Sequence, residues 1–229
     1  NKSDAEIDRA VSVGVGTIII DSFEEVDRVA AAAAQAGTRQ RVLVRVNSGV
    51  HAETHDFLAT AHEDQKFGIT LRDAPRVVAA IRAHSSLEFR GLHCHIGSQI
   101  FGSSGFRESA RRMVAAHTEL LAGGEAPQLN LGGGFGIAYT SIDDPAPIAD
   151  LAREIVDAVA EECVARGIAI PHLSFEPGRS IVGTAGVTLY SVGTTKEVTV
   201  DTPEGERMRR YISVDGGMSD NARTALYGA

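Results

Sequence analysis

The stretch "QLNLGGGFG" (residues 128–136) is a short apolar segment that runs directly into three consecutive glycines. Two other apolar segments end in a comparable way, in "HIGS" (95–98) and in "EPGR" (176–179). In parallel α/β barrels the functional residues gather at the carboxyl ends of the strands, in the loops that lead to the helices. Three such clusters on successive predicted strands favour a barrel over an arbitrary parallel sheet.

The pattern around these clusters alternates between the two element types. Ser22 and Glu25 form a capping-box pattern at the start of one predicted helix, and Asp73 is a candidate cap for the next. Strands alternating with helices imply βαβ units and a parallel sheet. The sequence therefore predicts an α/β fold that is part of a (β/α)8 TIM barrel. The predicted strands are 16–21, 41–47, 89–97, 128–134 and 172–178, and the predicted helices are 22–37, 73–81, 106–122 and 147–166.

The rhythm changes after Arg179, where "IVGTAGVTLYSVGTTKEVTV" and "RRYISVDGG" predict strands without intervening helices. We therefore expect a boundary near residue 180. Residues 1–180 would be a barrel portion, and residues 181–229 would begin a β domain. About five barrel strands are too few to close an eight-stranded barrel.

Composition excludes several classes of function. The 229 residues carry a net charge of −8, which disfavours a nucleic-acid backbone as a partner. There are only two cysteines and no long apolar run or signal peptide, so we expect a cytoplasmic protein that does not enter a membrane. Lysine is scarce: Lys2, Lys66 and Lys196 are the only candidates for lysine chemistry.

The "HCH" run at residues 93–95 suggests a metal site at first sight. On a strand, however, His93 and His95 point to one face and Cys94 to the other, so the three cannot converge on a metal. His93 is either a core residue or a functional one. His95 directly precedes a loop, where a flat imidazole could stack on an aromatic cofactor and the Ser98 hydroxyl could meet an anion.

The glycines of residues 132–134 do not form a dinucleotide-binding fingerprint, because Ile137 stands where a further glycine is required. They could expose backbone N–H groups to a phosphate, or they could form a tight turn or bulge. Glu176 ends an apolar strand, so it needs a partner. Either a protonated heterocyclic nitrogen or Arg179 would serve.

Near the C-terminal end of the sequence, Arg223 and Tyr227 stand four residues apart and would share a helical face. A guanidinium and a phenol so placed can hold a carboxylate. A surface arginine beside a buried tyrosine is the alternative.

Together, "HCHIGSQI", "LNLGGGFG", "EPGRSIVG" and "GGMSDNARTALYGA" resemble, in this order, the motifs of the diaminopimelate decarboxylase family. "NKSDAEI" and "THDFLATAHEDQKFGI" resemble further motifs of that family, so the resemblance covers essentially the whole chain. The family pairs an alanine-racemase-like barrel, which binds pyridoxal 5'-phosphate (PLP), with a β domain. The implied reaction converts meso-2,6-diaminopimelate to L-lysine and CO2, in a full-length homodimer.

The resemblance also implies residue roles. His95 would stack on the pyridine ring, and Glu176 would keep the pyridine nitrogen protonated, which makes the ring an electron sink. Residues 51–66 would form a lid. The phosphate would lie against Ser98, Gly132, Gly133, Gly134, Pro177, Gly178 and Arg179, and the distal carboxylate of the substrate would meet Arg179, Arg223 and Tyr227.

Two parts of the family pattern have no match in this chain. None of the three lysines stands in the context of the family's Schiff-base lysine, and the segment that carries the family's catalytic cysteine is missing. The resemblance therefore implies an internal fragment that is inactive alone. Two alternatives remain at this stage: a PLP-dependent decarboxylase of the ornithine or arginine type, and a non-catalytic PLP-binding protein.

Overall fold

The computed structural model describes residues 1–50 and 66–222. The chain forms two compact units, Asn1–Gly183 (unit 1) and Thr184–Ala229 (unit 2), which are described one at a time.

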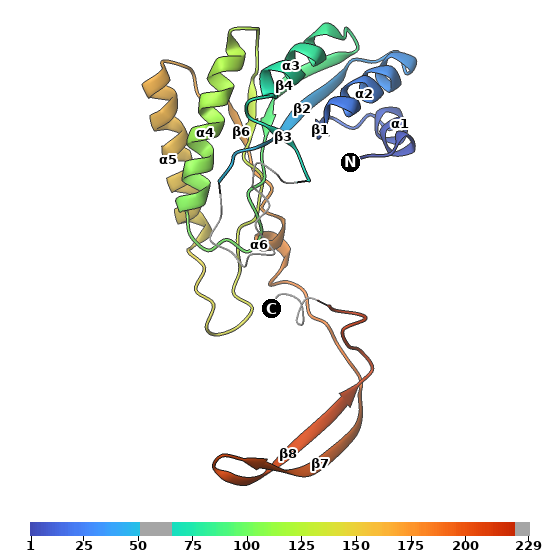
Figure 1. Ribbon diagram of the computed structural model, residues 1–229, viewed down its shortest axis with the longest axis vertical. Helices are drawn as coiled ribbons and strands as arrows, with labels where there is room; N and C mark the ends of the chain where they lie inside the picture. The colour runs from blue at the N-terminus through green and yellow to red at the C-terminus, as the bar shows by residue number, and fades with distance from the viewer. Residues whose placement is uncertain (51–65, 223–229) are drawn as a thin grey trace. The chain divides into compact units, whose positions relative to one another are not determined.

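Unit 1 is built around a parallel sheet (Figure 1). Neighbouring strands follow one another in the order β1-β2-β4-β5-β6, and the short β3 pairs with β2. This sequential order is the one a barrel needs, whereas a doubly wound sheet reverses its order at a switch point. The predicted α/β class is confirmed. The strands are β1 (Ile18–Ile20), β2 (Gln40–Asn47), β3 (Ile69–Thr70), β4 (Leu87–His93), β5 (Gln128–Asn130) and β6 (His172–Ser174).

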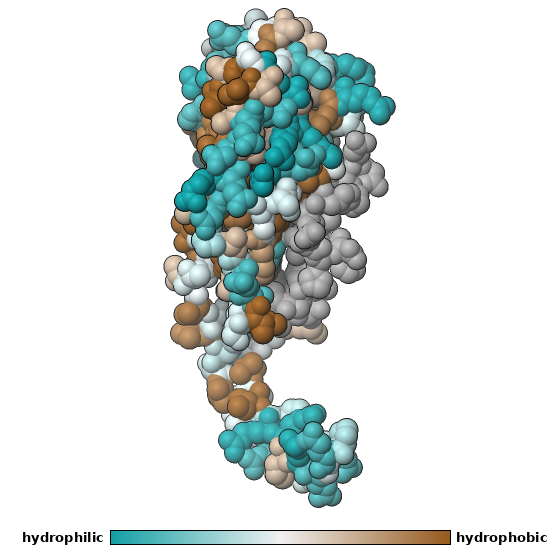
Figure 2. Space-filling view, turned by 90° about the vertical axis from the view of Figure 1, so that its left-hand side faces the viewer, coloured by the Kyte–Doolittle hydropathy of each residue, from teal (hydrophilic) through white to brown (hydrophobic). Residues whose placement is uncertain are grey.

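Helices cover the outer face of this sheet. Apolar side chains on alternate positions of β2, namely Val42, Val44 and Val46, are at most 1% exposed and join the core beneath the helices. Figure 2 views unit 1 from the side of α5, where hydrophilic side chains predominate over the centre of the outer surface. The helices are α1 (Asp4–Ser12), α2 (Phe23–Gln35), α3 (Ala74–Ala83), α4 (Ser104–Leu121), α5 (Ile148–Arg166) and α6 (Gly178–Val182).

A bulge in β4 decides which way its side chains point. Before it, Leu87 and Phe89 belong to the apolar core, and after it Leu92 and Cys94 do. The shift occurs beside Gly91, where an added Cβ would lie 1.8 Å from the carbonyl oxygen of Gln128. Without the bulge, the odd-numbered histidines that follow would point into the core instead of toward the opposite face.

The helix starts differ from the sequence prediction in three places. Ser3 caps α1 in a complete capping box with Glu6, and this helix was not predicted. The expected box at Ser22 is only half formed: Ser22 Oγ accepts from Glu25 N, while the Glu25 carboxylate turns away to the backbone of Asp21 and to Lys2. Asp73 precedes α3 without a side-chain cap; its carboxylate instead accepts from Thr70 and Arg76.

The segment that begins at Ile181 was predicted to be a strand, and this is wrong for its first two residues. Ile181 and Val182 end the short helix α6, which crosses residue 180. Unit 2 contains the antiparallel pair β7 (Val192–Thr202) and β8 (Gly205–Val214). No helix in residues 1–50 and 66–222 is long and apolar enough to cross a membrane.

Candidate cofactor site

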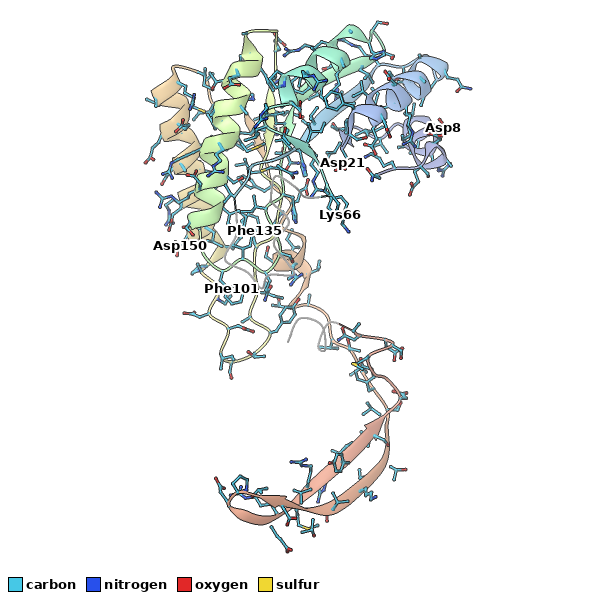
Figure 3. All side chains as sticks on the ribbon, in the orientation of Figure 1. Asp8, Asp21, Lys66, Phe101, Phe135 and Asp150 are labelled. Carbon is cyan, nitrogen blue, oxygen red and sulfur yellow. The ribbon has the colours of Figure 1, made fainter. Side chains whose placement is uncertain are left out.

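Three loops meet at the carboxyl ends of β4, β5 and β6, as the sequence predicted. Figure 3 shows Phe101 and Phe135 on the first two of these loops, beyond the strand ends. Backbone hydrogen bonds join the loops: Ile100 N donates to Gly134 O at 2.9 Å, and Glu176 N donates to Gly132 O at 2.8 Å. We call this region the strand-end site; its residues are His93, His95, Ser98, Asn130, Gly132, Gly133, Gly134, Glu176, Pro177, Gly178 and Arg179.

The three consecutive glycines allow the loops to approach this closely. A Cβ at Gly132 would lie 2.2 Å from the carbonyl oxygen of Cys94, and one at Gly133 would lie 2.0 Å from that of Glu176. At Gly134 the corresponding distance to the Gly97 oxygen is 2.3 Å. Each glycine therefore packs against the backbone of a neighbouring loop, so close approach, rather than turn geometry alone, requires them.

Two of these glycine amides already have acceptors inside the site. Gly132 N donates to Asn130 Oδ1 at 2.8 Å, and Gly133 N donates to His95 Nδ1 at 3.3 Å. The second bond makes Nδ1 an acceptor, so the His95 ring carries its proton on Nε2. Burial, with smaller contributions from Arg45 and His93, lowers the pKa of His95. The ring is a neutral flat surface at neutral pH.

Of the three remaining backbone amides in the predicted phosphate cradle, one has an acceptor and two have none among the described residues. Gly178 N donates to Glu176 O at 2.9 Å and is occupied. Within the described ranges, the amides of Gly134 and Arg179 have no acceptor. These two N–H groups, with the Ser98 hydroxyl, are the donors that the strand-end site offers to an anion.

Arg179 turns toward Ser98 rather than toward Glu176. Its Nη2 donates to Ser98 Oγ at 2.9 Å and its Nη1 donates to Gln99 Oε1 at 3.0 Å. The Gln99 side chain also bonds both backbone groups of Ile137, and its own backbone is held at φ 60°. Arg179 was one of the two candidate partners for Glu176, and the structure shows no ion pair between these two described residues.

The Glu176 carboxylate is held by one of its two oxygens. Oε1 accepts from Asn130 Nδ2 at 3.0 Å, and His93 Nε2 lies 3.1 Å from the same atom. The His93 contact is short but poorly directed, since neither ring nitrogen of His93 has a hydrogen-bond partner of good geometry in the described part of the chain. The neighbouring His93 ring, more than any other cause, lowers the pKa of Glu176, against the opposing effect of burial. The group is ionised at neutral pH.

Cys94 points to the opposite side of β4, as alternation predicted. Its Sγ lies 3.6 Å from Ser109 Oγ on α4, and burial raises the pKa of the thiol to about 11. The thiol cannot join the histidines around a metal. In the part of the chain that the structure describes, no group of three His, Cys, Asp or Glu side chains is arranged to hold a metal ion.

Of the predicted carboxylate clamp, the structure describes only Arg179, and of the predicted lid only Lys66. Arg223, Tyr227 and residues 51–65 lie outside the described residues. Sequence reasoning also missed Asn130 and Gln99, which link the loops. Asn130 could have been found, because in "QLNL" it is a polar residue between two leucines, two positions before the first glycine.

The residues of the strand-end site fit PLP. The neutral His95 ring can stack on a pyridine, two unoccupied amides and Ser98 can meet a phosphate, and Glu176 Oε2 has no donor among the described residues. An ionised carboxylate with a free oxygen is suited to a protonated ring nitrogen.

Comparison with known proteins agrees with this chemistry. Residues 1–183 match the family model of the pyridoxal-dependent decarboxylase, pyridoxal binding domain. The diaminopimelate decarboxylases of Mycobacterium tuberculosis and Bacillus methanolicus are 47% and 42% identical to this chain. Both are covered over 52% of their length and cover 100% of the chain. The chain therefore spans about half the length of these curated relatives.

Solved structures show the same likeness. The diaminopimelate decarboxylase of M. jannaschii in complex with L-lysine has a TM-score of 0.82 at 30% identity. That of Helicobacter pylori, also with L-lysine, has a TM-score of 0.79 at 26% identity. Each is matched over all of this chain and over 51% and 54% of its own chain, respectively. The fold is that of the alanine-racemase-like barrels, and the chain belongs to the pyridoxal-dependent decarboxylase family.

Proposed function

We propose that this chain supplies the PLP-binding half of a diaminopimelate decarboxylase, which converts meso-2,6-diaminopimelate to L-lysine and CO2. The relatives that share 42–47% of its residues carry that name, and two structurally similar enzymes were solved with L-lysine. Residues 1–180 would bind the cofactor and residues 181–229 would begin the β domain. A homodimer in the cytoplasm is part of the same proposal.

The observation that carries this proposal is the Glu176 carboxylate just after β6, which is ionised and whose Oε2 has no donor among the described residues. PLP, when bound, supplies an electron sink for the electron pair released as CO2 leaves. Glu176 would hold the proton on the pyridine nitrogen. The negative charge of the carboxylate stabilises that proton in a way that a neutral group cannot.

Other side chains of the strand-end site would bind and orient. The neutral His95 ring would lie flat against the pyridine, held in place by the Gly133 N–H. Ser98, Arg179 and the Gly134 amide would hold the phosphate, and Arg179 already donates to Ser98. Pro177, which precedes α6, and Gly178, which begins it, would set the start of this short helix next to the phosphate. The distal carboxylate of the substrate would meet Arg223 and Tyr227, with Arg179 as a third candidate.

A substrate panel tests the proposal. The PLP-loaded full-length enzyme that contains this chain should release CO2 from meso-diaminopimelate and form L-lysine in equal amount, at a rate well above that with L-ornithine or L-arginine. The 229-residue chain alone should release none, because no lysine of the described sheet stands at a barrel-strand end to hold the cofactor covalently. Preference for ornithine would contradict the substrate assignment, and turnover by the chain alone would contradict its role as half of the enzyme.

A further inference from the structure

Asn130 and the buried His93 both contact Glu176 through the same oxygen. Asn130 Nδ2 donates to Oε1 at 3.0 Å, and His93 Nε2 lies 3.1 Å from Oε1. Neither contacts Oε2, and no other described residue donates to it. One oxygen of the carboxylate is therefore fixed by the protein while the other is left for a ligand.

Asn130 has a fixed orientation that suits this role. Its Oδ1 accepts from Gly132 N at 2.8 Å, so its amide cannot flip without losing that bond. The residue is 8% exposed and lies on β5, between β4, which carries His93, and β6, which Glu176 follows. It thus ties the position of the Glu176 carboxylate to the glycine loop, which is itself packed against the backbone of Glu176.

In the described part of the chain, the His93 ring has no polar contact other than the one with Glu176. His93 is 4% exposed, and neither ring nitrogen has a hydrogen-bond partner of good geometry. Leaving a buried polar ring without a partner is unfavourable, so such a group in a folded protein calls for an explanation. Directing Nε2–H at Oε1, which lies 3.1 Å away, would give one of the two ring nitrogens a partner and add a second donor to that oxygen.

We propose that His93 and Asn130 are positioning residues that together fix Glu176 Oε1, so that Oε2 points at the pyridine nitrogen of PLP. This inference rests on the proposed role of Glu176 and adds the two residues that make that role possible. The Glu176 side chain is 44% exposed, so without these two contacts its carboxylate could adopt several rotamers. In a rotamer that turns Oε2 away from the cofactor, the carboxylate could not hold the proton on the pyridine nitrogen.

The test compares matched variants of the PLP-loaded holoenzyme, with the cofactor labelled with 15N at the pyridine nitrogen. His93→Leu removes the ring donor, and His93→Gln replaces it with an amide donor of similar reach. Asn130→Asp keeps the acceptor for Gly132 N but replaces the donor to Oε1 with a second carboxylate oxygen. Ser109→Ala, behind the same strand and away from Glu176, is the control for buried polar substitutions.

The 15N signal reports directly whether the pyridine nitrogen carries a proton. His93→Leu and Asn130→Asp should shift it toward the unprotonated form and lower kcat about tenfold to hundredfold, the range for losing a hydrogen bond to a charged group. KM for the substrate should change little. His93→Gln should recover most of the loss, and Ser109→Ala should leave the signal unchanged.

Glu176→Gln separates failure of the inference from failure of the proposed function. If Glu176→Gln shifts the 15N signal while His93→Leu and Asn130→Asp do not, the two residues do not position the carboxylate and the inference is overturned. If Glu176→Gln leaves the signal unchanged, the proposed role of Glu176 falls and the inference falls with it. Should His93→Leu fail to fold, Asn130→Asp decides alone, because it preserves the bond to the glycine loop.

Discussion

At the scale of single residues, the strand-end site depends on side chains whose partners could not be read from the sequence. Glu176 was singled out because a carboxylate ending an apolar strand requires a partner, and that argument holds. Which partner it has could not be predicted, since His93 and Asn130 come from two other strands. Arg179, the nearby candidate in sequence, is drawn away by Ser98 and Gln99.

The Arg179 contacts lead to a prediction about cofactor affinity. Arg179→Lys should weaken PLP binding about tenfold to hundredfold, because one ammonium group cannot hold Ser98 and Gln99 at once and still meet a phosphate. Titration of the apoprotein with PLP, followed by absorbance, measures the Kd. Arg166→Lys, an exposed pair partner of Glu162 on α5, is the control and should not change it. An unchanged Kd with a raised KM would place Arg179 at the substrate carboxylate alone.

At the scale of elements, apolar runs were sufficient to find every strand of the path β1-β2-β4-β5-β6, but not where each ends. The predicted strands 89–97, 128–134 and 172–178 stop at His93, Asn130 and Ser174. Beyond these points the backbone pairs with neighbouring loops instead of neighbouring strands, which is a tertiary effect. The β4 bulge beside Gly91 is also a tertiary effect, because Gly91 packs closely against the Gln128 carbonyl on the next strand.

The helix α6 is a second element whose type depends on tertiary contacts and not on local sequence preference. "GRSIV" ends in two β-branched residues, Ile181 and Val182, which favour strands locally, yet it is helical between Gly178 and Val182. The Arg179 side chain is anchored to the β4 loop, and Ser180 Oγ donates to Pro177 O within the turn. These contacts override the local preference.

Loop packing predicts the effect of a single added methyl group. Gly133→Ala would place a Cβ 2.0 Å from the Glu176 carbonyl oxygen, so the β5 and β6 loops must separate. Overpacking of this kind costs about 1–3 kcal/mol of unfolding free energy, and the strand-end site should lose PLP affinity as well. Urea unfolding and PLP titration measure the two effects. Gly102→Ala, in open space on the β4 loop, is the control; equal stability of both variants would contradict the packing account.

At the scale of the whole chain, the fold class and the order of the motifs could be predicted from the sequence. How the buried apolar side chains divide between the two units could not. Every buried apolar side chain among the described residues belongs to unit 1. In unit 2, all residues of β8 are exposed, and a lone two-stranded hairpin is marginally stable in water. The chain spans about half of its curated relatives, and its stable core is the part that carries the PLP-binding family match.

The central claim is that PLP binds where the β4, β5 and β6 loops meet, with its ring nitrogen on Glu176. The most direct measurement is an experimental structure of the PLP-loaded holoenzyme. We expect the pyridine nitrogen at about 2.7–2.9 Å from Glu176 Oε2, with Oε1 still on Asn130, the His95 ring against the cofactor, and the phosphate on Ser98 and the Gly134 amide. A cofactor bound elsewhere, or a ring nitrogen that has no contact with Glu176, would contradict the account.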